Sequence, residues 1–343
     1  MRPFTYERIG SVKEAVQAQM SAGTAARGAA TVHAPGQYLA GGTTLIDLMK
    51  LDVMRPQSVT DINALDQSPS GHIIYDTKGL RLGALVRMSA AADNADIRKN
   101  YPVIAQSLDL AASAQIRNMA SLGGNVLQRT RCTYFRDTSY EACNKREPGS
   151  GCAAMQGINR RHAILGTSER CIAAYAGDFA QALIALDAQV EIAGHKGTRK
   201  IAFQALHRPP GQTPHIETTL QPGELITAFV VPPATWARRS LYLKIRDRES
   251  YEFALASAAV VLDLDNGTAR QVRIALGGVS ALPWRAHAAE KQLTGKQLDD
   301  GTLNAAADAA FADARPMEHN AFKVALGKRT LIRALHQAAT MEL

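Results

Sequence analysis

Cysteine is absent from most of this 343-residue chain, and tryptophan occurs only twice. No apolar run approaches the roughly 18 residues that span a bilayer; the best candidate, 253–264, is shorter and reaches Asp263. The N-terminal stretch MRPFTYERIG has no apolar signal core. We therefore expect no membrane insertion and no secretion address in this chain.

Long basic runs interleaved with aromatic residues are also missing, although the net charge is +8. Such a charge can indicate nucleic-acid binding. However, the segment 129–170 holds eight Lys and Arg against four Asp and Glu, which is half of the excess. The charge is therefore a local feature, and we expect no nucleic-acid partner.

The remaining composition is that of an ordinary folded chain, with 46% hydrophobic residues and no repeat or low-complexity segment. The length suffices for two or three domains with real cores. Predicted strands lie at 38–40, 58–62, 72–75, 80–85, 171–175, 189–193 and 225–231, and predicted helices start at Ser11 and occupy 45–53, 90–99, 102–114 and 179–188. Asp178 is expected to cap the last of these helices.

The pattern changes after Pro232 and Pro233. Three strands are predicted at 241–246, 254–264 and 272–279, followed by helices at 284–293, 302–314 and 320–340. A meander of strands followed by helices is typical of an α+β unit. We place the main domain boundary near Pro233.

Two glycine pairs lie in hydrogen-bonding surroundings, GGTT at 41–44 and SLGGN at 121–125. The first joins a strand to a helix, where backbone N–H groups can approach a phosphate. Neither matches the dinucleotide fingerprint GxGxxG or the P-loop. Either pair alone is more often just a tight turn, but two in one domain favour a dinucleotide held between two lobes.

The four cysteines gather in one window, with ten, eight and eighteen residues between them: Cys132, Cys143, Cys152 and Cys171. Disulfides would need an oxidising compartment, and zinc sites and iron–sulfur clusters usually show closer spacing. Arginines and lysines in the window could offset the charge of a thiolate-bound cluster, or form a solvated loop face. The residues themselves leave a cluster, zinc, disulfides and free thiols open.

Taken in order, five motifs resemble one family along nearly the whole chain. They are LAGGTTLI from Leu39, QIRN from Gln115 followed by SLGGN, DFAQALIALDA from Asp178, GELI from Gly223 and ALGGV from Ala275. This series resembles the FAD-binding subunits of molybdenum hydroxylases, the family of xanthine dehydrogenase and carbon monoxide dehydrogenase. Ser121 stands where many relatives have Thr, which keeps the hydroxyl.

The cysteine window narrows the resemblance. RCTYFRDTSYEACNKREPGSGC, SERCIA and KIRDRESYEFALAS look like the FAD subunit type of bacterial three-subunit aldehyde oxidoreductases, which carries an extra [4Fe-4S] cluster. The resemblance implies that all four cysteines are its ligands. A comparable insert in 4-hydroxybenzoyl-CoA reductase means that the insert does not fix the substrate.

The resemblance also implies a fold. Residues 1–233 should form a two-lobed α+β FAD-binding domain of the vanillyl-alcohol oxidase (PCMH) type, with lobes at about 1–60 and 61–233 and the cysteine-bearing insert at about 129–171. Residues 234–343 should form a domain of the carbon monoxide dehydrogenase flavoprotein type, with a three-stranded sheet and a helical bundle.

Sixteen FAD-binding positions carry over: Gln37, Tyr38, Leu39, Ala40, Gly41, Gly42, Thr43, Thr44, Leu45, Ser121, Gly123, Gly124, Asn125, Asp178, Ile226 and Lys244. Taken alone, Asp178 could be a plain N-cap, Ile226 strand core and Lys244 an exposed strand residue. The resemblance places Lys244 near the flavin ring, where a cation would stabilise negative charge on the reduced flavin. No other catalytic role is expected in this chain.

The implied function is electron transfer. A large molybdopterin subunit would bind and oxidise an aldehyde, a small [2Fe-2S] subunit would pass the electrons on, and the FAD of this chain would deliver them to an external acceptor. Alternatives are a xanthine- or hydroxybenzoyl-CoA-type complex, a stand-alone FAD oxidase and a zinc-bound scaffold. The heterotrimer is expected in the periplasm, exported with a partner that bears a Tat signal, or alternatively in the cytoplasm.

Overall fold

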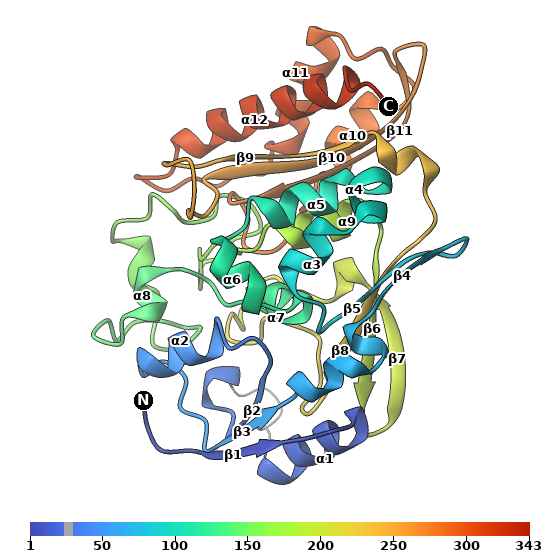
Figure 1. Ribbon diagram of the computed structural model, residues 1–343. Coiled ribbons are helices and arrows are strands. Elements are labelled where there is room, and N and C mark those ends of the chain that lie inside the picture. The colour runs from blue at the N-terminus through green and yellow to red at the C-terminus, as the bar shows by residue number, and fades with distance from the viewer. Residues whose placement is uncertain (24–29) are drawn as a thin grey trace.

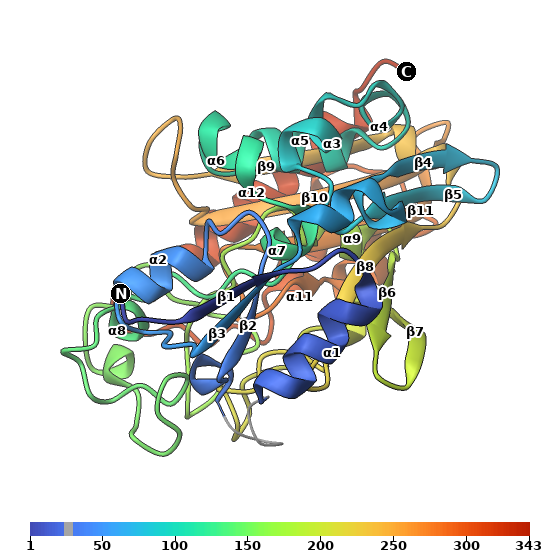
Figure 2. The same cartoon turned by 60° about the horizontal axis from the view of Figure 1, so that its bottom comes forward.

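The computed structural model describes residues 1–23 and 30–343 and begins with a small parallel sheet. Its strands lie in the order β1-β3-β2 and span Thr5–Arg8, Ser58–Asp61 and Gly36–Leu39. Helix α1 (Val12–Ala22) begins at Ser11, whose Oγ accepts a hydrogen bond from the Glu14 amide at 3.2 Å. Figure 2 shows α1 beside this sheet. The predicted helix start at Ser11 is confirmed.

A second, antiparallel sheet follows, with the strand order β4-β5-β8-β6-β7. The strands span Ile73–Asp76, Gly79–Gly83, Leu225–Val231, Gln189–Gly194 and Gly197–Ala202. Strand β8 comes last in the chain but pairs between β5 and β6. It therefore brings the segment 206–224, which precedes it, against residues from the beginning of the chain.

Short helices cover this part of the molecule. They are α2 (Leu45–Lys50), α3 (Met88–Asp93), α4 (Ala95–Asn100), α5 (Pro102–Asp109), α6 (Ala114–Met119), α7 (Leu122–Val126) and α9 (Phe179–Ala185). The single helix predicted at 90–99 is two, because the side chain of Asn94 caps the second by accepting from the Ile97 amide at 3.1 Å. Short 3₁₀ helices lie at Thr31–His33, Asn63–Gln67, Pro69–Gly71, Ala153–Met155, Phe203–Ala205 and Thr235–Arg238.

The C-terminal part is a sheet between two helical layers. The predicted strands are present as β9 (Ser240–Ile245), β10 (Ala256–Asp265) and β11 (Thr268–Gly277), and the two-residue strand β12 (Trp284–Arg285) adds a fourth. Helices α10 (His287–Leu293), α11 (Asp300–Ala310) and α12 (Phe322–Ala339) form one layer, while α5 and α9 pack against the other face (Figure 1). This sheet thus joins the two parts of the chain.

The cysteine-bearing segment 129–171 has little regular structure beyond helix α8 (Thr133–Arg136). In Figure 1 it occupies the left edge, near α2. The strand predicted at 171–175 is wrong, because only Cys171 forms a bridge, to Ser168, and the following residues join no sheet. Within residues 1–23 and 30–343, every helix is too short or too polar to cross a bilayer.

Candidate functional site

A cavity of about 740 Å³ lies between the two N-terminal sheets and is the main candidate site. Its wall is built from four segments that are distant in the sequence, within 34–45, 121–130, 173–175 and 216–226, with a few single residues between them. A volume of this size is in the range of small-molecule and cofactor sites. The strand order described above is what brings these segments together.

The first glycine pair forms the turn between β2 and α2 and faces this cavity. A Cβ atom on Gly41 would come within 2.0 Å of the Met119 carbonyl oxygen, and Gly42 has φ +74°. Both positions therefore require glycine. Within the described residues, the amides of Gly42, Thr43 and Thr44 have no hydrogen-bond acceptor, so this turn can donate to an anionic group at the start of α2.

The second glycine pair packs closely and uses its amides internally. The Gly123 amide donates to the Ala84 carbonyl at 2.7 Å, and the Gly124 amide donates to Ser121 Oγ at 3.2 Å. A Cβ on Gly123 would lie 3.1 Å from the Ala84 oxygen. This loop therefore forms a tight wall of the cavity, whereas the first loop offers free donors.

Twelve of the sixteen predicted FAD positions line the cavity: Gln37, Tyr38, Ala40, Gly41, Gly42, Thr43, Thr44, Leu45, Ser121, Gly123, Gly124 and Ile226. The other four, which do not, are Leu39, Asn125, Asp178 and Lys244. Leu39 packs against a hydrophobic cluster with α2, and the Asn125 amide group lies 3.4 Å from Met88 Sδ. Contact of any of the sixteen with FAD stays a prediction.

Asp178 and Lys244 form a buried ion pair. The Lys244 ammonium lies 2.8 Å from Asp178 Oδ2 and also donates to the Leu110 carbonyl at 2.9 Å. Tyr242 donates its hydroxyl to Asp178 Oδ1 at 2.6 Å. Asp178 stands at the N-cap position of α9, but its carboxylate accepts no hydrogen bond from the amides of that helix. The expectation that the Asp178 side chain caps the helix is therefore wrong. The alternative that Lys244 is an exposed strand residue is also wrong, because its side chain is only 1% exposed.

A second cavity of about 270 Å³ adjoins the first, and Cys132 is among its lining residues. The two share Thr130, Ala174 and Tyr175, and the second also touches Gly177, the neighbour of Asp178 in the chain. Burial raises the pKa of the Tyr175 hydroxyl, which donates to the Val126 carbonyl at 2.9 Å. Tyr175 is therefore a fixed, neutral element of the wall between the cavities.

Part of the cavity wall was not predicted from the sequence. The segment 216–222, which carries none of the predicted site residues or family motifs, lines the first cavity together with His207. Burial lowers the pKa of His207 to about 4, so its ring is neutral at physiological pH. Pro222 is the only turn-forming residue in this segment, and it does not indicate a ligand.

Cys143 and Cys171 each lie within electrostatic reach of the other three cysteines, and all four are free thiols. Cys143 and Cys152 face each other in an antiparallel bridge, and Cys132 Sγ lies 3.1 Å from His162 Nε2. Burial raises the pKa of Cys132 to about 12 and that of Cys171 to about 11. The thiols of Cys132 and Cys171 are therefore protonated unless a metal displaces their protons.

As a donor set, four neighbouring thiols fit an iron–sulfur cluster. As arranged here, the side chains in the described part of the chain form no group of three or more potential ligands around one metal position. The structure therefore contains the four candidate cysteine ligands but does not hold them around one metal position.

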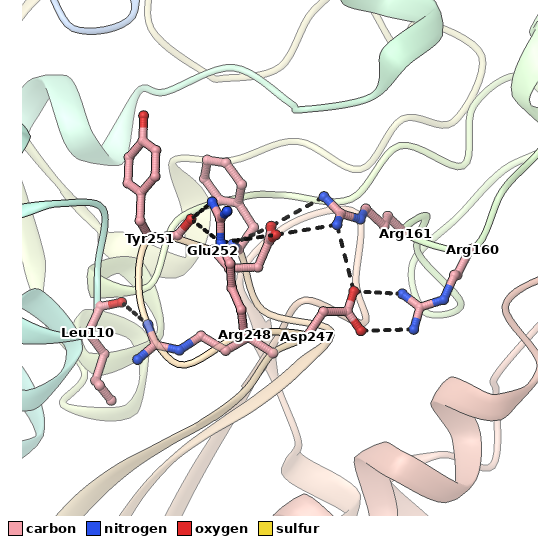
Figure 3. Close-up of polar contacts among 9 residues, drawn as sticks. Leu110, Arg160, Arg161, Asp247, Arg248, Tyr251 and Glu252 are labelled. Atoms are coloured by element: carbon pink, nitrogen blue, oxygen red, sulfur yellow. Dashed lines mark hydrogen bonds and ion pairs between the residues drawn. The ribbon is translucent and has the colours of Figure 1, made fainter.

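The cysteine-bearing segment is also tied to the C-terminal domain. Figure 3 shows Arg160 and Arg161 pointing from this segment toward Asp247 and Glu252 in the loop between β9 and β10. Arg160 makes two bonds to Asp247, of 2.8 and 2.9 Å, and Arg161 lies 3.2 Å from Glu252. These ion pairs link the segment to the C-terminal part of the chain.

Comparison with known proteins defines the class. Residues 2–234 match the family described as the FAD binding domain in molybdopterin dehydrogenase, and residues 241–338 match the CO dehydrogenase flavoprotein C-terminal domain. The chain belongs to the family of FAD-binding medium subunits of molybdenum hydroxylases, which are oxidoreductases. The predicted family and α+β fold class are confirmed, as is FAD as its cofactor.

Among its relatives, the chain is 45% identical to the aldehyde oxidoreductase FAD-binding subunit PaoB of Escherichia coli K12, over 98% of this chain and 99% of that protein. It is 26% identical to the carbon monoxide dehydrogenase medium chain of Afipia carboxidovorans, over 91% and 87% of the two chains. A solved Cu,Mo-CO dehydrogenase has the same fold, with a TM-score of 0.74 at 24% identity and 99% coverage of both chains.

Proposed function

We propose that this chain is the FAD- and [4Fe-4S]-containing electron-transfer subunit of a heterotrimeric, molybdenum-dependent aldehyde oxidoreductase. A large molybdopterin subunit would oxidise the aldehyde to a carboxylic acid. Electrons would then reach an external acceptor by way of a small [2Fe-2S] subunit and the FAD site of this chain. The 45% identity to an aldehyde oxidoreductase FAD-binding subunit over nearly the full length supports this choice among the molybdenum hydroxylases.

One observation carries the proposal: the cysteine-bearing segment forms part of the cavity wall. Thr130 and Lys145 of this segment line the cavity, and Cys132 and Cys143 respectively stand two residues away from them along the chain. A redox centre held by these thiols would lie beside a bound flavin. Related subunits that have no cysteine-bearing segment should have no such redox centre beside the flavin.

The residues of this chain bind and orient the cofactor. The free amides of Gly42, Thr43 and Thr44 fit a pyrophosphate, and the buried Ile226 side chain offers an apolar wall for a flavin ring. Bound FAD would supply a group that can take up and release electrons either one at a time or in pairs. The four thiols would hold the cluster, and the cations around them would offset its negative charge.

Localisation is part of the proposal. We infer that the complex is exported to the periplasm in a folded state together with a partner that carries a Tat signal, because clusters are assembled before export. Removing the partner's signal should then leave this chain in the cytoplasmic fraction. Cytoplasmic recovery of the intact wild-type complex would instead favour the alternative.

The decisive experiment is to purify the complex anaerobically with its partner chains and to measure iron, zinc, sulfide and flavin. We expect about four irons and four sulfides per FAD beyond those of the small subunit. Cys143→Ser should lose them, while Glu141→Gln, an exposed change in the same segment, should not. Zinc, or disulfides without iron, would refute the cluster, and aldehyde oxidation by this chain alone would refute the electron-transfer role.

A further inference from the structure

Three charged residues in the wall of the first cavity form a network that we call the Glu217 network: Arg129, Lys145 and Glu217. The Lys145 ammonium lies 2.8 Å from Glu217 Oε1, and the Arg129 guanidinium contacts Glu217 Oε2. Lys145 also donates to the Pro214 carbonyl at 3.1 Å. One carboxylate is thus shared by two cations.

The network is largely removed from water. The side chains of Arg129 and Lys145 are each 11% exposed, and that of Glu217 is 21% exposed. Burial alone would raise the pKa of Glu217, but Arg129 and Lys145 outweigh it and hold that pKa below its usual value. Glu217 is therefore ionised at neutral pH, and the network carries a net charge of +1.

The network joins two parts of the chain that have different tasks. Both cations come from the cysteine-bearing segment, whereas the carboxylate belongs to the cavity wall that precedes β8. Lys145 is also within electrostatic reach of Cys171. A second contact reinforces the junction, since Arg170 Nε donates to Gln212 Oε1 at 3.2 Å.

We propose that Glu217 is a positioning residue that couples FAD binding in the first cavity to the ordering of the four-cysteine segment. When FAD fills the cavity, the wall at Glu217 is held in place, and Glu217 holds Lys145 and Arg129 with the segment that carries the cysteines. Thermodynamic linkage makes the effect reciprocal, so that an ordered cysteine segment also strengthens FAD binding.

Removing the carboxylate should break this coupling. Without Glu217, two cations remain close together at a partly buried position, and an uncompensated buried charge is strongly unfavourable. The cysteine-bearing segment and the wall should then separate. The loss should show in two ways, as weaker FAD binding and as thiols that FAD no longer protects.

The test measures the reaction rate of the four thiols with a thiol-specific reagent, using the full chain purified without iron, with and without saturating FAD. In the wild-type chain, FAD should slow the reaction by at least about tenfold, a coupling of ordinary size. In Glu217→Gln the slowing should fall below about twofold, and FAD should bind about tenfold more weakly. Glu217→Asp keeps the charge and should retain more protection than Gln.

Glu191 provides a matched control. It also accepts from one arginine and one lysine, Arg81 and Lys200, each at 2.9 Å, and its side chain is likewise 21% exposed. It lies on β6, outside the cavity lining. Glu191→Gln should therefore keep the full protection by FAD. Because protection is a ratio within one variant, a general loss of stability does not imitate the result.

Lys145→Met supplies a second variant in case Glu217→Gln does not fold. It leaves Arg129 and Glu217 as a balanced pair, and should still reduce protection at least about threefold. Equal protection in the wild type and in either variant would overturn the inference. The inference rests on the proposed function only because it requires FAD in the cavity. A wild-type chain that binds no FAD overturns both the proposed function and the inference. A wild-type chain that binds FAD without any slowing of the thiol reaction overturns the inference alone.

Discussion

The buried pair of Asp178 and Lys244 yields a prediction that separates a structural role from flavin tuning. Asp178→Asn keeps the shape of the side chain and an oxygen that can accept from Tyr242, but it removes the negative charge. Lys244 is then a buried, unpaired cation, since its side chain is only 1% exposed. Breaking a buried ion pair from one side costs about 3–5 kcal/mol.

The assay is thermal unfolding of the full chain with FAD bound. At about 2–4 °C per kcal/mol, Asp178→Asn should lower Tm by roughly 6–20 °C. The double variant Asp178→Asn/Lys244→Met should recover at least half of this loss, because no lone charge remains. As a control, Asp308→Asn breaks an exposed pair with Lys328 and should cost less than about 1 kcal/mol.

The reasoning fails if Asp178→Asn is no more destabilising than the control, or if the double variant is worse than both single variants. The same set tests the predicted contact with flavin. If Lys244→Met shifts the reduction potential of the bound flavin more than Asp178→Asn does, the cation acts on the flavin in addition to neutralising Asp178.

Two further predictions concern the cavity wall. Gly41→Ala should destabilise the chain by about 3 kcal/mol and abolish stoichiometric FAD binding, because its Cβ would collide with the backbone carbonyl of Met119. The control Gly10→Ala should be neutral, because the nearest atom to its Cβ would be 3.8 Å away. Equal effects of the two variants in chemical denaturation would contradict the argument. Because burial lowers the pKa of His207 to about 4, the unfolded chain binds more protons between about pH 6.5 and 4. The free energy of unfolding should therefore decrease as the pH is lowered from about 6.5 to about 4. This residue should contribute up to about 1.4 kcal/mol per pH unit to that decrease. An unchanged slope in His207→Gln would rule out this source.

Local features of the sequence determined a good part of this protein. Whereas the close approach of Gly41 to Met119 depends on the fold, Gly42 requires glycine because of its positive φ, a local reason, so the position of the GGTT turn between β2 and α2 could be predicted. The same holds for the gathering of the four cysteines, for the strands β9 to β11 and for the series of motifs that indicates the family. Each of these signals depends on neighbours along the chain.

The tertiary structure decided the rest, because the contacts concerned join residues that are far apart in the sequence. Lys244 reaches Asp178 across 66 positions, and Lys145 reaches Glu217 across 72. Hydrophobic periodicity reports only which face of an element is buried, so it could not pair these charges. Asp178 stands at the N-cap position of α9, but its carboxylate pairs with the buried Lys244 of strand β9. Only the fold brings that cation within reach of Asp178.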